Sequence, residues 1–162
     1  MRIIEGVAEE LSAEGQPWRI TAVGALDLLP AETAAALKAA EEHTVDRTGM
    51  RVNVAVGYGG RREITDAVRS LLQQHVEAGT PLEDVAEMLD VEHIAAHLYT
   101  RGQPDPDLVI RTSGEQRLSG FLLWQSANSE FYFCDALWPD FRKVDFLRAL
   151  RDYAERQRRF GE

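Results

Sequence analysis

The sequence predicts an α/β fold in which helices flank a mostly parallel sheet, and two observations carry this prediction. Strand-like and helix-like segments alternate along the 162 residues, an order typical of parallel sheets covered by helices. Apolar residues make up 44% of the chain, which is enough to build a hydrophobic core. Neither an internal repeat nor a linker is visible, so we expect residues 1–162 to belong to a single domain.

Three helices and two strands are expected in the first half of the chain. Apolar residues recur at helical spacing in residues 1–13 and again after Gly60, and residues 30–44 are rich in Ala and Glu. Alternating apolar residues predict strands at 18–23 and 52–56. The first helix shows no N-cap, and its apolar pattern is already present at its start, so we expect the chain to begin inside an element.

Shorter elements are expected in the second half of the chain. One or two helices are predicted over residues 82–99, and a terminal helix is predicted over residues 144–158. The other expected elements are strands at 108–110 and 131–134 and a short helix at 121–125. Four strands are few for a sheet that is covered on both faces. The fold is therefore expected to be incomplete at its amino-terminal side.

Composition and charge narrow the range of functions. The whole net charge of −9 falls in residues 1–100, while residues 101–162 are balanced, which argues against a nucleic acid as partner. No run of about eighteen apolar residues is present, and the start of the chain lacks the apolar segment of a signal peptide. Cys134 is the single cysteine, so no internal disulfide can form, and we expect a reducing, cytoplasmic location.

Groups suited to phosphate binding gather in residues 107–124, where an apolar strand runs into a polar loop. The loop contains two guanidinium groups, small hydroxyls and a glycine, at Arg111, Arg117, Thr112, Ser113, Ser119 and Gly114. Ligands of α/β sheets bind at the carboxyl ends of strands, and arginine forks suit phosphate oxygens. Surface ion pairs with Asp105, Asp107 or Glu115 explain either arginine taken alone, but the whole cluster favours a phosphate or diphosphate site.

The polar loop belongs to a longer block, residues 107–141. This block contains Asp-Leu-Val-Ile-Arg-Thr-Ser-Gly-Glu-Gln-Arg-Leu-Ser, Ser-Glu-Phe-Tyr-Phe and Leu-Trp-Pro-Asp-Phe. Together with residues 53–64 and the tail at 158–161, it resembles the undecaprenyl diphosphate synthase family of cis-prenyltransferases. The resemblance covers most of the chain from about residue 18 onward. It implies an enzyme that condenses isopentenyl diphosphate with an allylic diphosphate.

The resemblance also implies roles for individual residues. Arg111, Arg117 and Ser119 are expected to hold the diphosphate of isopentenyl diphosphate. Glu130 is expected to be a ligand of Mg²⁺, a cation that prefers oxygen ligands and is often shared with substrate phosphates. Substrate binding and metal binding would then use residues from the same block.

A homodimer is a further implication of the resemblance. Arg159 and Gly161 match a tail motif that reaches the active site of the other subunit in family dimers. Among the aromatic residues, we assign Trp138 to the subunit interface, and Phe131 and Phe133 to the core. The expected partners are the two diphosphate substrates and a second copy of the chain, with a peripheral membrane contact made through the product.

Two departures from the family pattern affect catalysis. Gln116 stands where many relatives have a histidine linked to metal handling. More seriously, the opening motif Asp-Gly-Asn-x-Arg-Trp is absent, and neither Asp27 nor Asp46 has a matching context. We therefore predict the carboxyl-terminal portion of a cis-prenyltransferase domain, which holds the isopentenyl-diphosphate half of the site, has no catalytic residue and is inactive alone. The alternative is a non-catalytic subunit that supports a catalytic partner.

Three other features have simpler interpretations. His93 and His97 have the spacing of a metal pair on a helix, but no third ligand is evident, so a partly exposed helix face is preferred. Cys134 lies next to aromatic residues in an expected strand and is interpreted as a buried small side chain. The turn at Tyr58-Gly59-Gly60 precedes a helix, and it is equally compatible with anion binding and with a plain strand-to-helix connection.

Overall fold

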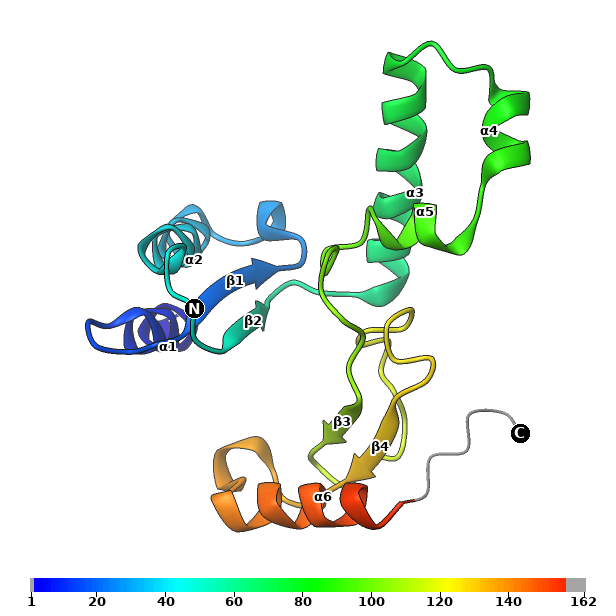
Figure 1. The fold of residues 1–162 in the computed structure, drawn as a ribbon. Coiled ribbons are helices and arrows are strands. Elements are labelled where there is room, and N and C mark those ends of the chain that lie inside the picture. The colour runs from blue at the N-terminus through cyan, green and yellow to red at the C-terminus, as the bar shows by residue number, and fades with distance from the viewer. Residues whose placement is uncertain (1, 157–162) are drawn as a thin grey trace. The chain divides into compact units, whose positions relative to one another are not determined.

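The computed structural model describes residues 2–156 of the chain (Figure 1). The chain forms two compact units, Met1–Gly102 and Gln103–Glu162, and each unit contains one pair of strands. Both pairs are parallel. The predicted class, helices combined with parallel strands, is therefore confirmed, with the four strands divided between two sheets.

The first unit follows the predicted order of elements closely. Its helices are α1 (Arg2–Ser12), α2 (Ala31–Thr44), α3 (Gly60–Glu77), α4 (Leu82–Met88) and α5 (Val91–Ala95). Its strands are β1 (Arg19–Val23) and β2 (Arg51–Ala55), with a short 3-10 helix at Leu26–Leu28. The strands pair in register from Arg19 opposite Arg51 to Val23 opposite Ala55. The predicted helices and strands of residues 1–99 are thus present, with ends shifted by a few residues.

A small apolar core holds α1 and α2 against β1. Ala8, Ile20, Leu37 and Ala40 are almost fully buried and form one cluster. Figure 1 shows the blue and cyan helices lying beside the strand pair. At the end of β1, Gly24 has a φ of 117°, and a Cβ placed there would lie 2.3 Å from the carbonyl oxygen of Val56. A glycine is therefore required where the two chain segments leave the sheet.

A buried carboxylate connects α3 to the segment that follows α5. The side chain of Glu63 is fully buried and accepts hydrogen bonds from the Tyr58 hydroxyl and from the backbone N–H of Tyr99, the latter at 2.9 Å. The Tyr99 hydroxyl donates to Asp66 at 2.7 Å, and the rings of Tyr58 and Tyr99 meet edge to face at 6.2 Å. Burial, and then this bond to Asp66, raise the pKa of Tyr99 to about 12. A carboxylate taken out of water is costly unless it is well hydrogen-bonded, and the two donors provide that compensation.

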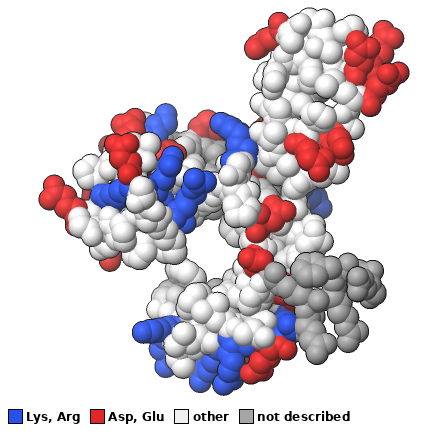
Figure 2. Space-filling view, in the orientation of Figure 1, with Lys and Arg blue, Asp and Glu red and all other residues white. Residues whose placement is uncertain are grey.

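The second unit consists of short elements around a long connection. Its strands are β3 (Leu108–Arg111) and β4 (Glu130–Phe133), followed by a 3-10 helix at Trp138–Asp140 and by α6 (Lys143–Glu155). The buried Asp145 accepts a hydrogen bond from the backbone N–H of Arg142 at 3.1 Å and caps the start of α6. Figure 2 shows basic and acidic side chains side by side along α6 and a cluster of acidic side chains around α4.

The predicted helix at 121–125 is wrong. Residues 119–128 form a succession of turns. Ser119, Gly120 and Leu122 all have positive φ values, of 43°, 81° and 47°, and left-handed residues interrupt the regular hydrogen-bond ladder of an α-helix. Apolar spacing alone could not reveal this, because Phe121-Leu-Leu-Trp-Gln125 has good helix formers.

The burial predicted for two side chains, Phe133 in β4 and Cys134 directly after it, also needs correction. Cys134 is partly exposed and follows the strand directly, so it is not a buried core side chain. Phe133 is 39% exposed, although its ring stacks on that of Phe131 at 6.4 Å. The second unit has little core of its own to cover these side chains. No helix within residues 2–156 has the length and apolar character needed to cross a membrane.

Candidate functional site

The polar loop begins where β3 ends, and backbone hydrogen bonds fix its first residues. The N–H groups of Ser113 and Gly114 donate to the carbonyls of Ala136 and Cys134 at 2.8 and 3.0 Å. The N–H of Cys134 donates to the carbonyl of Arg111 at 2.8 Å. These bonds extend the pairing beyond the last strand residues, so the base of the loop is fixed at the carboxyl end of the sheet.

The structure brings the three predicted substrate-binding residues into one cluster. Arg111 donates from Nη1 to the Ser119 hydroxyl at 2.7 Å and from Nε to the backbone carbonyl of Glu115 at 3.2 Å. Its Nη2 also contacts the Glu115 carboxylate. Arg117 reaches the same carboxylate through Nη2 and Nε, at 3.0 and 3.3 Å. The contact with Arg117 and then that with Arg111 lower the pKa of Glu115 below its usual value.

A pocket of about 330 Å³ lies beside this cluster. It is lined by the end of β3 and the loop, through Val109–Ser113, Leu118, Ser119 and Phe121. A diphosphate group is small enough for such a space, and hydroxyl and guanidinium donors face the same region.

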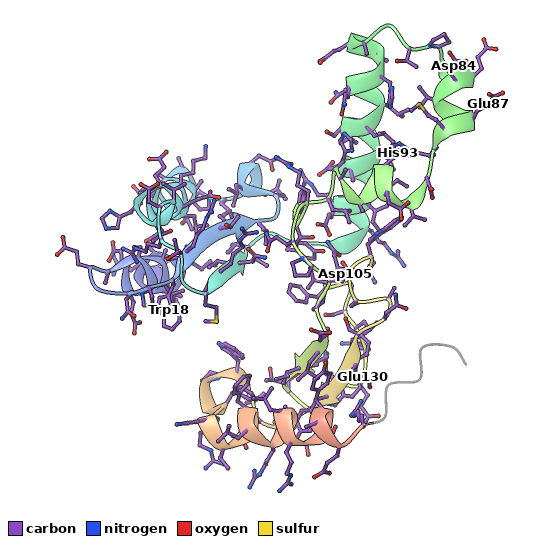
Figure 3. All side chains as sticks on the ribbon, viewed as in Figure 1. Trp18, Asp84, Glu87, His93, Asp105 and Glu130 are labelled. Atoms are coloured by element: carbon purple, nitrogen blue, oxygen red, sulfur yellow. The ribbon has the colours of Figure 1, made fainter. Side chains whose placement is uncertain are left out.

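Glu130, the predicted metal ligand, lies at the opposite end of the strand pair. It is opposite Leu108, whereas Arg111 is opposite Phe133, so about 10 Å of strand separates Glu130 from the cluster. Figure 3 shows Glu130 near the end of α6, and its carboxylate accepts a hydrogen bond from Arg156 at 2.8 Å. This contact with Glu130, and then that with Asp152, raise the pKa of Arg156. Residues 2–156 contain no group of three or more acidic, histidine or cysteine side chains able to hold a metal.

Two other predicted residues, Arg159 and Gly161, lie outside the described part of the chain. The exposed Gln116 lies in the loop between the two arginines of the cluster. The structure therefore places the predicted diphosphate-binding residues together and Glu130 apart from them. A metal at Glu130 would need most of its ligands from a substrate phosphate, from water or from protein groups other than residues 2–156.

Both histidines, His93 and His97, have structural hydrogen-bond partners, as Tyr58 has in Glu63. His93 accepts from the N–H of Asp90 at 3.1 Å and completes the cap of α5. The Nε2 atom of His97 lies 2.8 Å from the side-chain oxygen of Gln74, and its Nδ1 atom lies 2.8 Å from the carbonyl of His93. Both rings therefore serve helix ends and packing, in agreement with the simpler interpretation.

The network around Glu63 has no counterpart in the sequence predictions. A signal for it exists, because Glu63 falls between Gly60 and Ala67 on the buried stripe of α3, which continues to Leu71. An acidic residue at a position of the buried stripe requires buried donors. The sequence alone does not say which side chains provide them.

A pocket and an arginine pair at the end of a parallel strand are typical of α/β proteins that bind phosphate groups. Residues 1–161 match the family model described as putative undecaprenyl diphosphate synthase. The chain therefore belongs to the undecaprenyl diphosphate synthase family.

Relatives and solved structures agree with this assignment. The chain is 63% identical over 159 residues to isoprenyl transferase 1 of Streptomyces avermitilis and 67% identical over 159 residues to the (2Z,6E)-farnesyl diphosphate synthase of Thermobifida fusca. In both comparisons the match covers 98% of this chain and 62% of the relative. The chain thus spans less than two thirds of the length of these relatives.

Two solved structures have the same fold. Lavandulyl diphosphate synthase from Lavandula x intermedia, in complex with dimethylallyl diphosphate, is 39% identical with a TM-score of 0.88. A probable undecaprenyl diphosphate synthase from Campylobacter jejuni is 28% identical with a TM-score of 0.80. Each match covers 99% of this chain, and 69% and 72% of the respective neighbours.

Proposed function

We propose that the chain is the carboxyl-terminal part of a cis-prenyltransferase and binds the diphosphate of isopentenyl diphosphate through Arg111, Arg117 and Ser119. The observation that carries the proposal is that Arg111 and Ser119 line a pocket at the end of β3, with Arg117 joined to Arg111 through the Glu115 carboxylate. Prenyltransferase relatives support the choice of substrate class. Charge-assisted hydrogen bonds of this kind contribute about 1.5–3 kcal/mol each.

In the complete reaction, a new carbon–carbon bond joins isopentenyl diphosphate to the allylic carbon. The bond from that carbon to its diphosphate breaks, the diphosphate leaves with the electron pair, and a proton is lost from the isopentenyl unit to form the double bond. The part played by this chain is to bind and orient isopentenyl diphosphate, whose own diphosphate stays intact. Fixing that group limits the positions of the reacting carbon and so lowers the entropic cost of the reaction.

A magnesium ion belongs to this proposal, and it would neutralise charge that develops on diphosphate oxygens. Glu130 offers one carboxylate of the kind that Mg²⁺ accepts, and Mg²⁺ commonly takes one or two protein carboxylates together with substrate phosphates. Arg156 contacts one oxygen of Glu130 at 2.8 Å, and a carboxylate can bind a metal through its other oxygen. The donor set therefore fits a metal that is shared with a substrate.

The absence of Asp-Gly-Asn-x-Arg-Trp from the sequence leads us to propose that this chain alone does not turn over substrate. The same observation favours a second candidate, a non-catalytic subunit that supports a catalytic prenyltransferase. Both candidates retain the isopentenyl-diphosphate site. They differ in whether an upstream segment carrying the aspartate motif restores activity.

Assembly as a homodimer is also part of the proposal. Trp138 is 73% exposed and stacks on Phe141 at 5.7 Å, and Leu137 is 59% exposed beside it. An exposed apolar patch of this kind is typical of a partner surface, and a two-fold interface would cover it on both copies. We place the dimer in the cytoplasm, with a peripheral membrane contact made through the product. Sedimentation at micromolar concentration should show a dimer, and Trp138→Ala should weaken it.

Titration calorimetry with isopentenyl diphosphate tests the binding site directly. The chain should bind it, and Arg111→Ala should bind it more weakly. Equal affinity in the two proteins would contradict the assignment of Arg111 to the diphosphate site. Incorporation of labelled isopentenyl diphosphate by the chain and by an upstream-extended version then separates the two candidates, because activity restored by the extension supports the enzyme.

A further inference from the structure

We propose that the Glu115 carboxylate is an internal competitor for the diphosphate, occupying both arginines until a ligand displaces it. This inference rests on the proposed function of the same site. On this inference, an anion that the loop itself supplies lowers the affinity of the site for the diphosphate.

The hydrogen bonds of Arg117 are the first observation. Both Nη2 and Nε of Arg117 are directed at the two oxygens of Glu115. These are the donors of the guanidinium fork that would grip a phosphate oxygen pair. A diphosphate can therefore use this Nε/Nη2 edge of Arg117 only after Glu115 has left it.

Arg111 is held mainly by other groups. This difference distinguishes a carboxylate that competes with the ligand for the arginines from an organiser, which would hold the arginines in position for the ligand. Its Nε donates to the backbone carbonyl of residue 115, and its Nη1 donates to Ser119 at 2.7 Å. Neither bond involves the Glu115 carboxylate. Removing that carboxylate would leave Arg111 in place with its Nη2 released, and would free the fork of Arg117.

Exposure and charge make the exchange feasible. The side chains of Glu115 and Arg117 are 44% and 74% exposed, and exposed ion pairs contribute little to stability. The arginines lower the pKa of Glu115, so the carboxylate is ionised and present as a competitor at neutral pH. A diphosphate carries more negative charge than one carboxylate, so it gains more from the two arginines.

Titration calorimetry of the full chain with inorganic diphosphate and with isopentenyl diphosphate tests the inference. Glu115→Gln should bind both about two- to fivefold more tightly than the parent, the range expected when an exposed ion pair no longer opposes binding. The matched control is Asp105→Asn, which removes one negative charge from the exposed segment before β3. It should leave the affinity unchanged.

A second comparison locates the effect at Arg117. In an Arg117→Ala background, Glu115→Gln should give a smaller gain, because the fork that it frees is already absent. Glu115→Ala provides a second variant should the amide of Gln form a bond of its own, and far-ultraviolet circular dichroism confirms that each variant is folded.

The outcomes separate this inference from the proposed function. One outcome is that the parent binds, Arg111→Ala does not, and neither Glu115→Gln nor Glu115→Ala gains affinity. This outcome would contradict the role of Glu115 as a competitor and would still support the proposed binding site. Weaker binding by both Glu115 variants would identify Glu115 as an organiser. An equal gain of affinity in Asp105→Asn would contradict the inference, because it would show that the effect comes from net charge alone. No binding by the parent or by either Glu115 variant would overturn both proposals.

Discussion

One carboxylate from each unit, Glu63 in the first and Glu115 in the second, shows two opposite settings. In Met1–Gly102, Glu63 is fully buried and hydrogen-bonded within the unit, whereas in Gln103–Glu162 the Glu115 side chain is 44% exposed between two arginines. Among the described residues, every fully buried apolar side chain except Ala149 belongs to the first unit. Glu63 thus contributes to the stability of the first unit, whereas Glu115 is exposed where a ligand can reach it.

The core of the first unit should give the largest stability effect. Leu37 is fully buried in the cluster that holds α1 and α2 to β1, and Leu37→Ala should lower the free energy of unfolding by about 2–5 kcal/mol. Leu28, at 61% exposure, is the matched control, and Leu28→Ala should cost less than about 0.5 kcal/mol. Urea unfolding measures both, and similar costs at the two positions would break the comparison between core and surface.

The arginine cluster should give its largest effect on binding and little on stability. Arg111→Ala should weaken the binding of isopentenyl diphosphate by about 1.5–3 kcal/mol, which corresponds to about ten- to 150-fold. Arg151 is 76% exposed on α6 and lies 4.0 Å from Glu155, so Arg151→Ala is a control that should bind normally. A large loss of stability in Arg111→Ala would instead assign the arginine to the fold.

The same substitution in the two units sharpens the comparison further. Glu63→Gln replaces a buried acceptor of two donors and should destabilise the chain by about 1–3 kcal/mol. Glu115→Gln removes an exposed pair and should change the free energy of unfolding by less than about 1 kcal/mol. Urea unfolding of the two variants under one condition is sufficient. Equal losses would mean that burial does not distinguish the two carboxylates.

Lowering the pH should reveal a smaller contribution to the free energy of unfolding, which comes from the surface of α3. The Tyr99 hydroxyl, followed by Arg69 and Arg62, lowers the pKa of Asp66. A carboxyl with a depressed pKa in the folded state contributes stability above its unfolded value, near pH 3.9, and loses it as the pH falls through the folded value. The parent should therefore exceed Asp66→Asn in stability at pH 6, and the gap should narrow below about pH 4. A gap that stays constant down to pH 2 would contradict this linkage.

The sequence predicted regular elements better than the loop between them. Periodicity located α3 and β1, because each buries one face along its length. It failed at Phe121–Gln125, where backbone conformations at Ser119 and Leu122 decide the path. Such conformations depend on how the loop closes and leave no periodic signal.

The candidate site was predictable in part. Arg111, Arg117 and Ser119 were expected to act together, and in the structure Arg111 bonds Ser119 directly while the Glu115 carboxylate joins the two arginines. The position of Glu130 at the far end of β4 depends on strand register, which motif spacing does not provide. The role of Glu115 as the shared partner needed the geometry of both guanidinium groups, because sequence proximity allowed several acidic partners.

The connection between β3 and β4 has a consequence for how this family can vary. Neighbouring parallel strands require the chain to return from the end of one to the start of the next, and residues 112–129 make that return with turns in place of a helix. Surface loops usually tolerate gains and losses of residues, but here the proposed ligand-binding stretch is also the return path between the paired strands. We therefore expect natural diversity and successful engineering in residues 112–129 to proceed by exchange of side chains at constant length.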